Sequence, residues 1–322
     1  MNEKAVSVLE QYDRNVIKSF KGRGTMICET DKGYCVLKEY TGTVQKLAVI
    51  DALQHGLSEM TSDYLIPTRE GELFCEDQEH VKYILKELVI GQEMNYKDEK
   101  ELYKAFGKMA SMHLDFEKQK LPALPITSYV EEIEKHTMEC IHVKNYLKKL
   151  KSKNDFEKRL LGCMDHFLEM QREICELAKQ EDMTAYCAKV ADLGCFIHGD
   201  FQYHNLLCME SDMAVINFER VQSESGVKDF YRMFRKVEEK LDWSVEPGKR
   251  MLDSYQSIRP FQAWEWRHLQ LKLAYPEKFW KIVNTYANTK KSWIPDKNKS
   301  KLEDFLQQEE KRQRILKELF YL

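Results

Sequence analysis

The change in residue pattern near Gly91 constrains the fold of this chain more than any other feature of its sequence. Before it, short apolar stretches separated by turn residues predict strands. After it, long amphipathic stretches predict helices. The strands are expected at 14–20, 25–30, 34–40, 72–75 and 80–88, with one helix at 43–54. The sequence therefore predicts an α+β protein in which residues 1–90 form a small antiparallel lobe and residues 91–322 a larger, mostly helical lobe.

Within the helical part, one region has a different pattern. Helices are expected at 98–114 and over 127–180, but Phe196-Ile197 indicates a short strand that leads into a polar loop. The stretches 206–209 and 213–218 indicate a hairpin around Glu210-Ser211-Asp212. The charged segment 301–322 is expected to be an amphipathic helix.

Charge and hydropathy exclude several classes of protein. The chain has 50 basic and 53 acidic residues among 322, a net charge of −3, so it lacks the basic excess of a dedicated nucleic-acid binder. No apolar run approaches the ~18 residues of a membrane span, and no apolar signal segment follows Met1. The nine Cys are scattered singly, which favours buried thiols over disulfides or a metal site. We therefore expect synthesis in the cytosol, with no nucleic-acid and no membrane partner.

The most informative motif is the loop His198-Gly199-Asp200-Phe201-Gln202-Tyr203-His204-Asn205. Phosphoryl transfer needs a carboxylate that accepts the proton of the attacking hydroxyl, and near it an oxygen ligand for Mg²⁺. An Asp in a loop and an Asn five residues later, where the chain enters a strand, can meet both needs. The alternative interpretation is an ordinary turn rich in loop-forming residues and closed by Asn205.

With this motif the chain resembles the aminoglycoside phosphotransferase and choline kinase group, relatives of the protein kinases. Within the group it is most similar to the spore-coat branch, the CotS family of endospore-forming bacteria. The similar segments are G-R-G-T-M-I-C-E-T, C-V-L-K-E-Y, H-G-D-F-Q-Y-H-N, V-K-D-F-Y-R-M-F-R-K and Y-P-E-K-F-W-K-I-V-N. The last two favour the spore-coat branch. The resemblance implies a two-lobed protein-kinase-like fold.

It also implies roles for single residues. Asp200 matches the catalytic-loop Asp, and Asn205 matches the Asn that ligates Mg²⁺. Lys38 matches the Lys that contacts the α- and β-phosphates of ATP, although a lone strand Lys is more often solvated. His198 matches a residue that holds the loop. Asp229 matches the Asp that braces the loop from the next helix, with an ordinary helix-start charge as the alternative.

Nucleotide contacts are implied at two further places. Gly22 and Gly24 fall at the turn between the first two strands, over the phosphates. Glu87, Leu88 and Val89 match the hinge whose backbone meets adenine. The cofactors implied are thus ATP and Mg²⁺.

The chain departs from the family pattern at the second metal position. Kinases of this class place an Asp there as the main Mg²⁺ ligand, and this chain has Asn217. Glu219 lies two residues on and faces the same side of an extended strand, so it could take over the role. The acidic partner of Lys38 is also open, with Asp51 and Glu59 as candidates.

Two functions are therefore expected. One is ATP-dependent phosphotransfer to a hydroxyl of an unknown small molecule by a kinase-like spore-coat protein. The other is a pseudokinase that serves as a structural component of the spore coat and contacts other coat proteins. Either way the protein would be made in the mother-cell cytosol and deposited on the spore.

Overall fold

The computed structural model describes residues 8–22, 24–210, 212–289 and 296–322, which fall into two compact units. Unit 1 runs to Leu124 and resumes over Leu193–Asp229. Unit 2 consists of Pro125–Asp192 and Phe230–Leu322. Residues 91–124 and the predicted catalytic loop therefore belong to the same unit as the N-terminal region. The lobe boundary near residue 90 stays a prediction.

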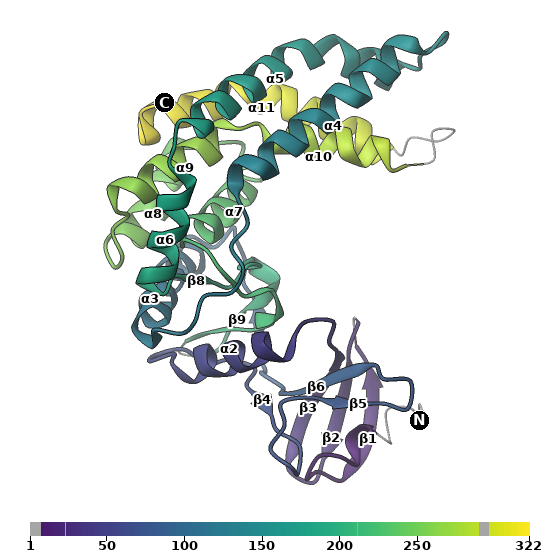
Figure 1. Cartoon of the computed structure of the whole chain (residues 1–322), viewed down its shortest axis with the longest axis vertical. Coiled ribbons are helices and arrows are strands. Elements are labelled where there is room, and N and C mark those ends of the chain that lie inside the picture. Colours follow the sequence, from purple (N-terminus) through teal and green to yellow (C-terminus); the bar gives the residue numbers. More distant parts are fainter. Residues whose placement is uncertain (1–7, 23, 211, 290–295) are drawn as a thin grey trace. The chain divides into compact units, whose positions relative to one another are not determined.

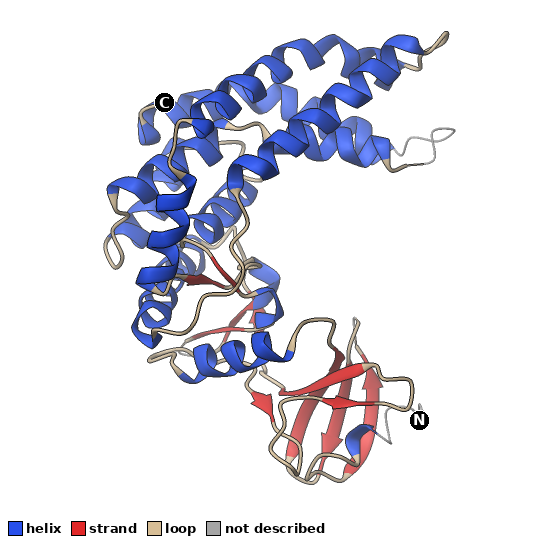
Figure 2. Ribbon diagram, in the orientation of Figure 1, coloured by secondary structure: helices blue, strands red, loops and turns tan. Residues whose placement is uncertain are grey.

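The first part of unit 1 is an antiparallel sheet, drawn in red at the N-terminal end of the chain in Figure 2. Its strands lie in the order β1-β2-β3-β6-β4, and β5 also pairs with β6. The bounds are β1 Val16–Lys21, β2 Met26–Thr30, β3 Gly33–Glu39, β4 Leu65–Ile66, β5 Cys75–Glu76 and β6 Lys82–Glu87.

The β2–β3 turn shows why these residues pair as they do. Gly33 has a φ of 101°, a conformation that side chains other than glycine rarely adopt. The turn sets the register Cys28↔Cys35, which places both thiols on the buried face. On that face the two cysteines lie with Leu37 and Leu85, and the N-terminal Tyr12 packs into the same cluster, which forms the core of the sheet.

Two helices of unit 1 begin at side-chain caps. Helix α2 (Val44–His55) follows Thr43, whose hydroxyl accepts from the Lys46 N–H. Helix α3 (Glu99–Gln119) follows Asp98, whose carboxylate accepts from the N–H groups of Lys100 and Glu101. Such caps satisfy N–H groups that have no partner within the helix.

The rest of unit 1 consists of two small sheets and two 3₁₀ turns. One sheet has the order β10-β9-β7 and the other pairs β11 with β8, all antiparallel. At Gly91 a Cβ would lie 2.9 Å from the Cys208 carbonyl oxygen, so only glycine lets the chain approach β9 this closely. The bounds are β7 Gln92–Glu93, β8 Phe196–Ile197, β9 Leu206–Cys208, β10 Met213–Val215, β11 Gln222–Ser223, η1 Tyr203–Asn205 and η2 Phe218–Arg220.

Unit 2 is helical (Figure 1). Helix α7 starts at the end of unit 1 and continues into unit 2. The bounds are α4 Tyr129–Lys149, α5 Asp155–Lys179, α6 Met183–Leu193, α7 Val227–Glu238, α8 Val245–Gln256, α9 Ala263–Ala274, α10 Glu277–Ala287 and α11 Asp296–Phe320.

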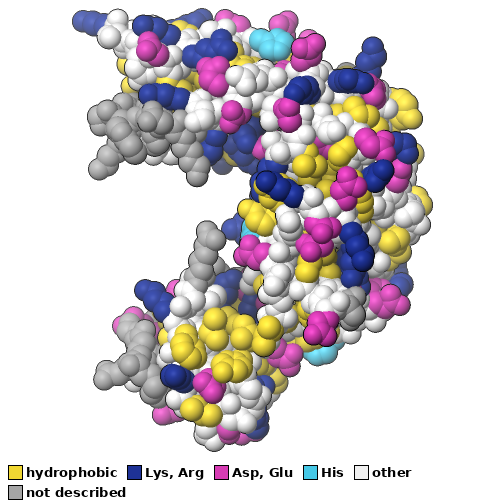
Figure 3. Space-filling view, turned by 180° about the vertical axis from the view of Figure 1, so that it is seen from behind, with side chains coloured by type: hydrophobic (Ala, Val, Ile, Leu, Met, Phe, Trp, Pro, Cys, Tyr) yellow, Lys and Arg dark blue, Asp and Glu magenta, His cyan; other side chains and the backbone are white. Residues whose placement is uncertain are grey.

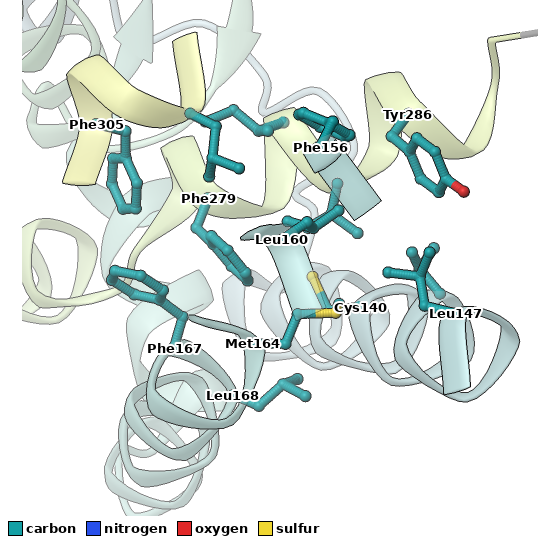
Figure 4. Close-up of a cluster of buried hydrophobic side chains, with 14 residues drawn as sticks. Cys140, Leu147, Phe156, Leu160, Met164, Phe167, Leu168, Phe279, Tyr286 and Phe305 are labelled. Atoms are coloured by element: carbon teal, nitrogen blue, oxygen red, sulfur yellow. The ribbon is translucent and has the colours of Figure 1, made fainter. Parts of the chain in front are cut away.

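Aromatic side chains form the centre of the main core of unit 2 (Figure 4). The rings of Phe167 on α5 and Phe279 on α10 stack with centroids 4.6 Å apart, and Phe305 on α11 lies 4.9 Å from Phe167. Buried aromatic side chains of this size account for much of the stability of a helical core. Trp280 packs against the same core and stacks on His136 at 3.4 Å, so it belongs to helix packing.

The α+β fold class predicted from the sequence is confirmed, with differences at short elements. The strand expected at 72–75 is only Cys75–Glu76. Strands β4, β7 and β11, of two residues each, and helix α6 were not predicted. Two residues are too few to show an alternating pattern, so among the two-residue strands only the apolar pair of β8 was predicted with its observed bounds. Part of the predicted hairpin turn, Ser211, lies outside the described residues.

Charges of both signs are interspersed on the face drawn in Figure 3, and hydrophobic side chains gather over the N-terminal sheet. Exposed apolar residues of that sheet are Ile17, Phe20 and Tyr34. All nine cysteines are free thiols. None of the helices in the described residues is both long and apolar enough to cross a bilayer.

Candidate active site

The loop 198–205 is held in a conformation that requires glycine at its second position. Gly199 has a φ of 78°, and a Cβ there would lie 2.0 Å from the Arg220 carbonyl oxygen. Both the backbone conformation and the lack of space exclude a side chain. The loop therefore packs directly against the backbone of η2.

Asp229, at the start of α7, accepts hydrogen bonds from this loop. Its Oδ2 accepts from the His198 N–H at 2.8 Å and its Oδ1 from the Gly199 N–H at 3.0 Å. The carboxylate is fully buried, and Nε2 of His113 on α3 lies 3.5 Å from it. Charge-assisted hydrogen bonds of this kind are stronger than neutral ones, so they fix the loop backbone.

His198 is held as a neutral imidazole. Its Nδ1 accepts from the Asp200 N–H at 3.2 Å, and its Nε2 faces the Ile216 carbonyl oxygen at 2.9 Å. A nitrogen that faces a carbonyl must donate, so the single proton sits on Nε2. Burial lowers the pKa of this imidazole, which agrees with the neutral form. His198 thus links the loop to the residue that directly follows β10.

The Asp200 carboxylate is partly exposed and surrounded by donors. Gln202 Nε2 donates to its Oδ1, and Asn205 Nδ2 lies 3.3 Å from its Oδ2. Asn205 Nδ2 also donates to the Asp200 backbone oxygen at 2.8 Å, which ties the two ends of the loop together. His204 Nε2 lies 3.9 Å from Oδ2. An ionised carboxylate in this setting can accept a proton from a hydroxyl group.

Two lysines from neighbouring strands of the sheet reach toward this region. Lys38 on β3 pairs with Ile84, and Lys86 on β6 pairs with Val36, so both lysine side chains leave the same face of the sheet. Their ammonium groups share one carboxylate oxygen, Glu219 Oε1, at 3.2 Å from Lys38 Nζ and 2.7 Å from Lys86 Nζ. The side chain of Lys86 is only 4% exposed, whereas that of Lys38 is 29% exposed.

Asp63 is the second carboxylate of this cluster. It lies in the segment before β4, and its Oδ2 is 2.6 Å from Lys86 Nζ. It also accepts from the Asn217 N–H at 3.0 Å. Gln54 on α2 donates to the Asp63 carbonyl oxygen at 3.2 Å and to Ser62 Oγ at 2.8 Å. Asp63 therefore connects α2, β6 and the segment after the hairpin.

Asn217 occupies the position where the family pattern has an Asp. Its φ is 69°, in the left-handed region that Asn and Asp tolerate better than other side chains. Its Oδ1 accepts from Lys86 Nζ at 3.0 Å, and its Nδ2 donates to Asn205 Oδ1 at 2.9 Å. Both ends of its carboxamide are thus used within the protein.

The charges of the cluster stabilise one another. Burial alone would raise the pKa of Glu219, but the ammonium groups of Lys86 and Lys38 outweigh it and hold this pKa at about 2. Burial would lower the pKa of Lys86, but Asp63 and Glu219 raise it, so the ammonium stays protonated. Burial raises the pKa of Asp63, and the Lys86 ammonium opposes that rise.

The residues expected to hold Mg²⁺ were Asn205, Asn217 and Glu219. In each of them a side-chain oxygen faces an N–H donor: Asn217 Nδ2, Lys86 Nζ, and both lysines, respectively. Among the described residues no group of three or more His, Cys, Asp or Glu side chains lies close enough to hold a metal ion. In this arrangement the donor set does not fit a divalent cation.

The residues expected to contact the nucleotide lie on the sheet of unit 1. Gly22 and Gly24 flank the β1–β2 turn, where the Gly22 N–H donates to the Thr25 carbonyl oxygen at 2.9 Å. Gly24 has a φ of 68° and no heavy atom within 4 Å of a Cβ position, so the backbone is open there. Arg23, between them, lies outside the described residues. Of the hinge residues, Glu87 ends β6, and Leu88 and Val89 follow it.

Sequence reasoning missed Lys86 and Asp63, and it left the acidic partner of Lys38 open between Asp51 and Glu59. The Asp51 carboxylate lies 3.4 Å from His55 Nδ1 instead. At Glu59 it is the backbone oxygen that accepts a hydrogen bond, from the Lys108 ammonium. The ion pair of Lys38 is with Glu219. A signal for Lys86 did exist, because a lysine two residues after Ile84 in an apolar strand shares its buried face. No local pattern marks Asp63.

Comparison of the sequence with known proteins finds a distant relative. The chain is 23% identical over 326 residues to spore coat protein S of Bacillus subtilis (strain 168), a match that covers 95% of this chain and 90% of that protein. No protein-family model matches the chain. The resemblance to the spore-coat branch inferred from the motifs is confirmed at this distance.

Solved structures confirm the fold. An aminoglycoside phosphotransferase from Alicyclobacillus acidocaldarius superposes with a TM-score of 0.81 at 17% identity, over 97% of this chain and 93% of that one. A spectinomycin phosphotransferase solved with ADP and spectinomycin gives a TM-score of 0.57 at 14% identity, over 94% and 91% of the two chains. The chain thus has an aminoglycoside phosphotransferase-like, kinase-like fold.

Proposed function

We propose that this chain is a kinase-like protein of the spore coat that binds ATP on unit 1 and transfers its γ-phosphate to a hydroxyl group of a small molecule. The observation that carries the proposal is the Asp200 loop. The loop is fixed from behind by Asp229, while the Asp200 carboxylate remains partly exposed and accepts hydrogen bonds.

Each retained residue has a chemical task in this proposal. Asp200 accepts the proton of the acceptor hydroxyl as the oxygen attacks phosphorus. Lys38, the more exposed of the two lysines, contacts the phosphates, and Gly24, near Gly22 in the β1–β2 turn, leaves the backbone open toward them. The hinge residues Glu87, Leu88 and Val89 lie on the adjoining strand end. Similarity to a phosphotransferase solved with ADP supports the choice of nucleotide.

A second function is favoured by one specific observation. Asn217 replaces the metal-binding carboxylate, and its amide oxygen accepts from a buried ammonium. A chain that lost turnover in this way would be a pseudokinase acting as a structural component of the spore coat. Similarity to spore coat protein S supports the location in both cases. We propose synthesis in the mother cell and deposition on the spore surface, next to other coat proteins.

Calorimetric titration with ATP tests the nucleotide site. We expect wild type to bind ATP, and Lys38→Ala to bind it more weakly, because a hydrogen bond to a charged group contributes about 1.5–3 kcal/mol. Lys18→Ala is the matched control, since Lys18 is an exposed lysine of the same sheet. The absence of heat with wild type, or an equal loss in both variants, would contradict the proposal.

Turnover separates the two functions. Wild type and Asp200→Asn are incubated with radiolabelled ATP and a mixture of small polyols and sugars. Label that appears on an acceptor with wild type and not with Asp200→Asn supports the transferase. Nucleotide binding without any transfer supports the structural function. A fluorescent fusion that stays diffuse in sporulating cells would exclude the coat location.

A further inference from the structure

The Lys86 ammonium uses all three of its donors on side-chain oxygens. Its Nζ lies 2.6 Å from Asp63 Oδ2, 2.7 Å from Glu219 Oε1 and 3.0 Å from Asn217 Oδ1. An ammonium has three N–H groups, so its coordination is complete. Two of these three oxygens belong to residues that the sequence assigned to a metal ion.

The charges of this cluster balance without a metal. Asp63 and Glu219 contribute two negative charges, and Lys86 and Lys38 contribute two positive charges. Asn217 is neutral, so it adds an oxygen ligand without disturbing the balance. An Asp at this position would leave one negative charge unpaired, and a bound divalent ion would leave two positive charges unpaired.

A directional chain of hydrogen bonds runs from Lys86 to the catalytic loop. Lys86 donates to Asn217 Oδ1, Asn217 Nδ2 donates to Asn205 Oδ1 at 2.9 Å, and Asn205 Nδ2 points to Asp200 Oδ2 at 3.3 Å. The cation at one end and the carboxylate at the other fix how both carboxamides are turned. Both amide oxygens therefore face N–H donors.

From these contacts we infer that Lys86 is the resident cation of the site and that it replaces the divalent metal ion. It orients Asn217, and through it Asn205 and Asp200. The nucleotide part of this inference rests on the proposed function: ATP binds to this chain without a divalent metal ion. Lys86 is a positioning residue, because it acts through Asn217.

Removing the ammonium should create a metal site. In Lys86→Met the oxygens of Asp63, Glu219 and Asn217 lose their shared cation, and a set of carboxylate and amide oxygens is what Mg²⁺ and Mn²⁺ bind. The first experiment therefore needs no nucleotide. The thermal unfolding temperature is measured in EDTA and with millimolar Mg²⁺ or Mn²⁺.

We expect no metal-dependent shift for wild type and a rise of several degrees for Lys86→Met, because a ligand that binds only the folded state raises its stability. Lys38→Met is the control, since the ion pair of Lys38 is with Glu219 and the oxygens of Asp63 and Asn217 stay on Lys86. Lys86→Gln, which keeps N–H donors, replaces Lys86→Met if that variant does not fold. A shift in wild type, or none in a folded Lys86 variant, would overturn the inference.

The second experiment measures ATP affinity with Mg²⁺ and with EDTA. For wild type the two dissociation constants should agree within about threefold, and for Lys86→Met they should differ by about tenfold or more in favour of Mg²⁺. A wild type that needs Mg²⁺ for ATP binding would overturn the inference. A wild type that binds no ATP in either buffer would refute the proposed function, while the metal titration still decides the role of Lys86.

Discussion

Unit 1 and unit 2 both bury charged side chains, but in unit 1 these groups also hold the loop that contains Asp200. In unit 1 the buried polar groups form a network that joins segments far apart in the sequence. Lys86 contacts Asn217, 131 residues later, and the Asn217 N–H donates to Asp63, 154 residues earlier. His198 and Asp229 hold the other side of the same loop. Each of these side chains is held in its orientation by a hydrogen bond or an ion pair with another group of the network.

In unit 2 the buried charges either fix helix ends or join helices of that unit. Arg259 pairs with Glu265 at 2.8 Å, six residues away, at the start of α9. Glu238, at the end of α7, accepts from the Ser244 N–H at 2.8 Å, and its Oε1 is buried with no hydrogen-bond partner among the described residues. These groups fix helix ends, while the aromatic core holds the helices together.

The comparison separates buried charges that hold only the fold from buried charges that also hold the candidate active site. A buried ion pair contributes little net stability, because desolvation offsets the attraction. A network that also fixes the orientation of a catalytic loop has a role beyond stability. We therefore expect apolar substitutions to matter most in unit 2 and polar substitutions to matter most in unit 1, which four predictions make measurable.

Phe279→Ala should have the largest effect. Phe279 is fully buried and stacks on Phe167, so its removal leaves a cavity. Such truncations cost about 3–5 kcal/mol in the free energy of unfolding, which urea titration measures. Ile258→Ala is the control, because Ile258 is 42% exposed in the same unit. Equal losses in the two variants would break the distinction between core and surface in unit 2.

Asp229→Asn should be the most damaging conservative polar change in unit 1. The two N–H groups of His198 and Gly199 would lose a charged acceptor, at a cost of about 2 kcal/mol. The amide protons of these two residues should then exchange faster with deuterium. Asp253→Asn, on the surface of α8, is the control. Unchanged exchange at both residues would show that Asp229 does not hold the loop.

Glu238 should make unfolding depend on pH. Burial raises the pKa of this carboxyl to about 8, so it is protonated in the folded state at neutral pH. A raised pKa gives stability that is fully present below the unfolded value and is lost as pH rises through about 8. The loss should reach up to about 1.4 kcal/mol per pH unit between these values.

The comparison that isolates this effect is wild type against Glu238→Gln over the pH range from acidic to mildly alkaline. The neutral Gln should remove the additional loss of stability toward high pH. Glu303→Gln, which changes an exposed partner of Arg159, should leave the pH profile unchanged. Parallel profiles for wild type and Glu238→Gln would mean that the carboxyl is ionised in the folded protein.

The smallest expected effect is the coupling between Asn205 and Asn217. If the network orients its members, the effects of Asn205→Ala and Asn217→Ala should not add, and a double-mutant cycle should give an interaction free energy of at least about 0.5 kcal/mol. The effects of Asn205→Ala and Asn288→Ala should add, because Asn288 is an exposed residue of unit 2. Additivity of both pairs would break the comparison, because the buried groups of unit 1 would then act independently of one another.

The sequence by itself determined the larger elements and the loop. Helices α2 and α3 were predicted from apolar residues at helical spacing, and the side chains of Thr43 and Asp98 cap them. Strands β1, β2, β3 and β6 were predicted from apolar stretches and turn residues. Gly199 and Asp200 were placed by a motif whose spacing is local. These features depend on interactions within a few residues, so the linear sequence carries their signal.

Only the tertiary structure decided the electrostatics of the site. The partner of Lys38 turned out to be Glu219, and the buried ammonium beside it belongs to Lys86, which no motif had marked. Asp63, in an irregular segment, became its main counter-charge. The physical reason is that burial decides which charges must pair, and burial arises when distant segments pack together. The sequence named the residues around the loop, and packing decided which oxygen faces which nitrogen.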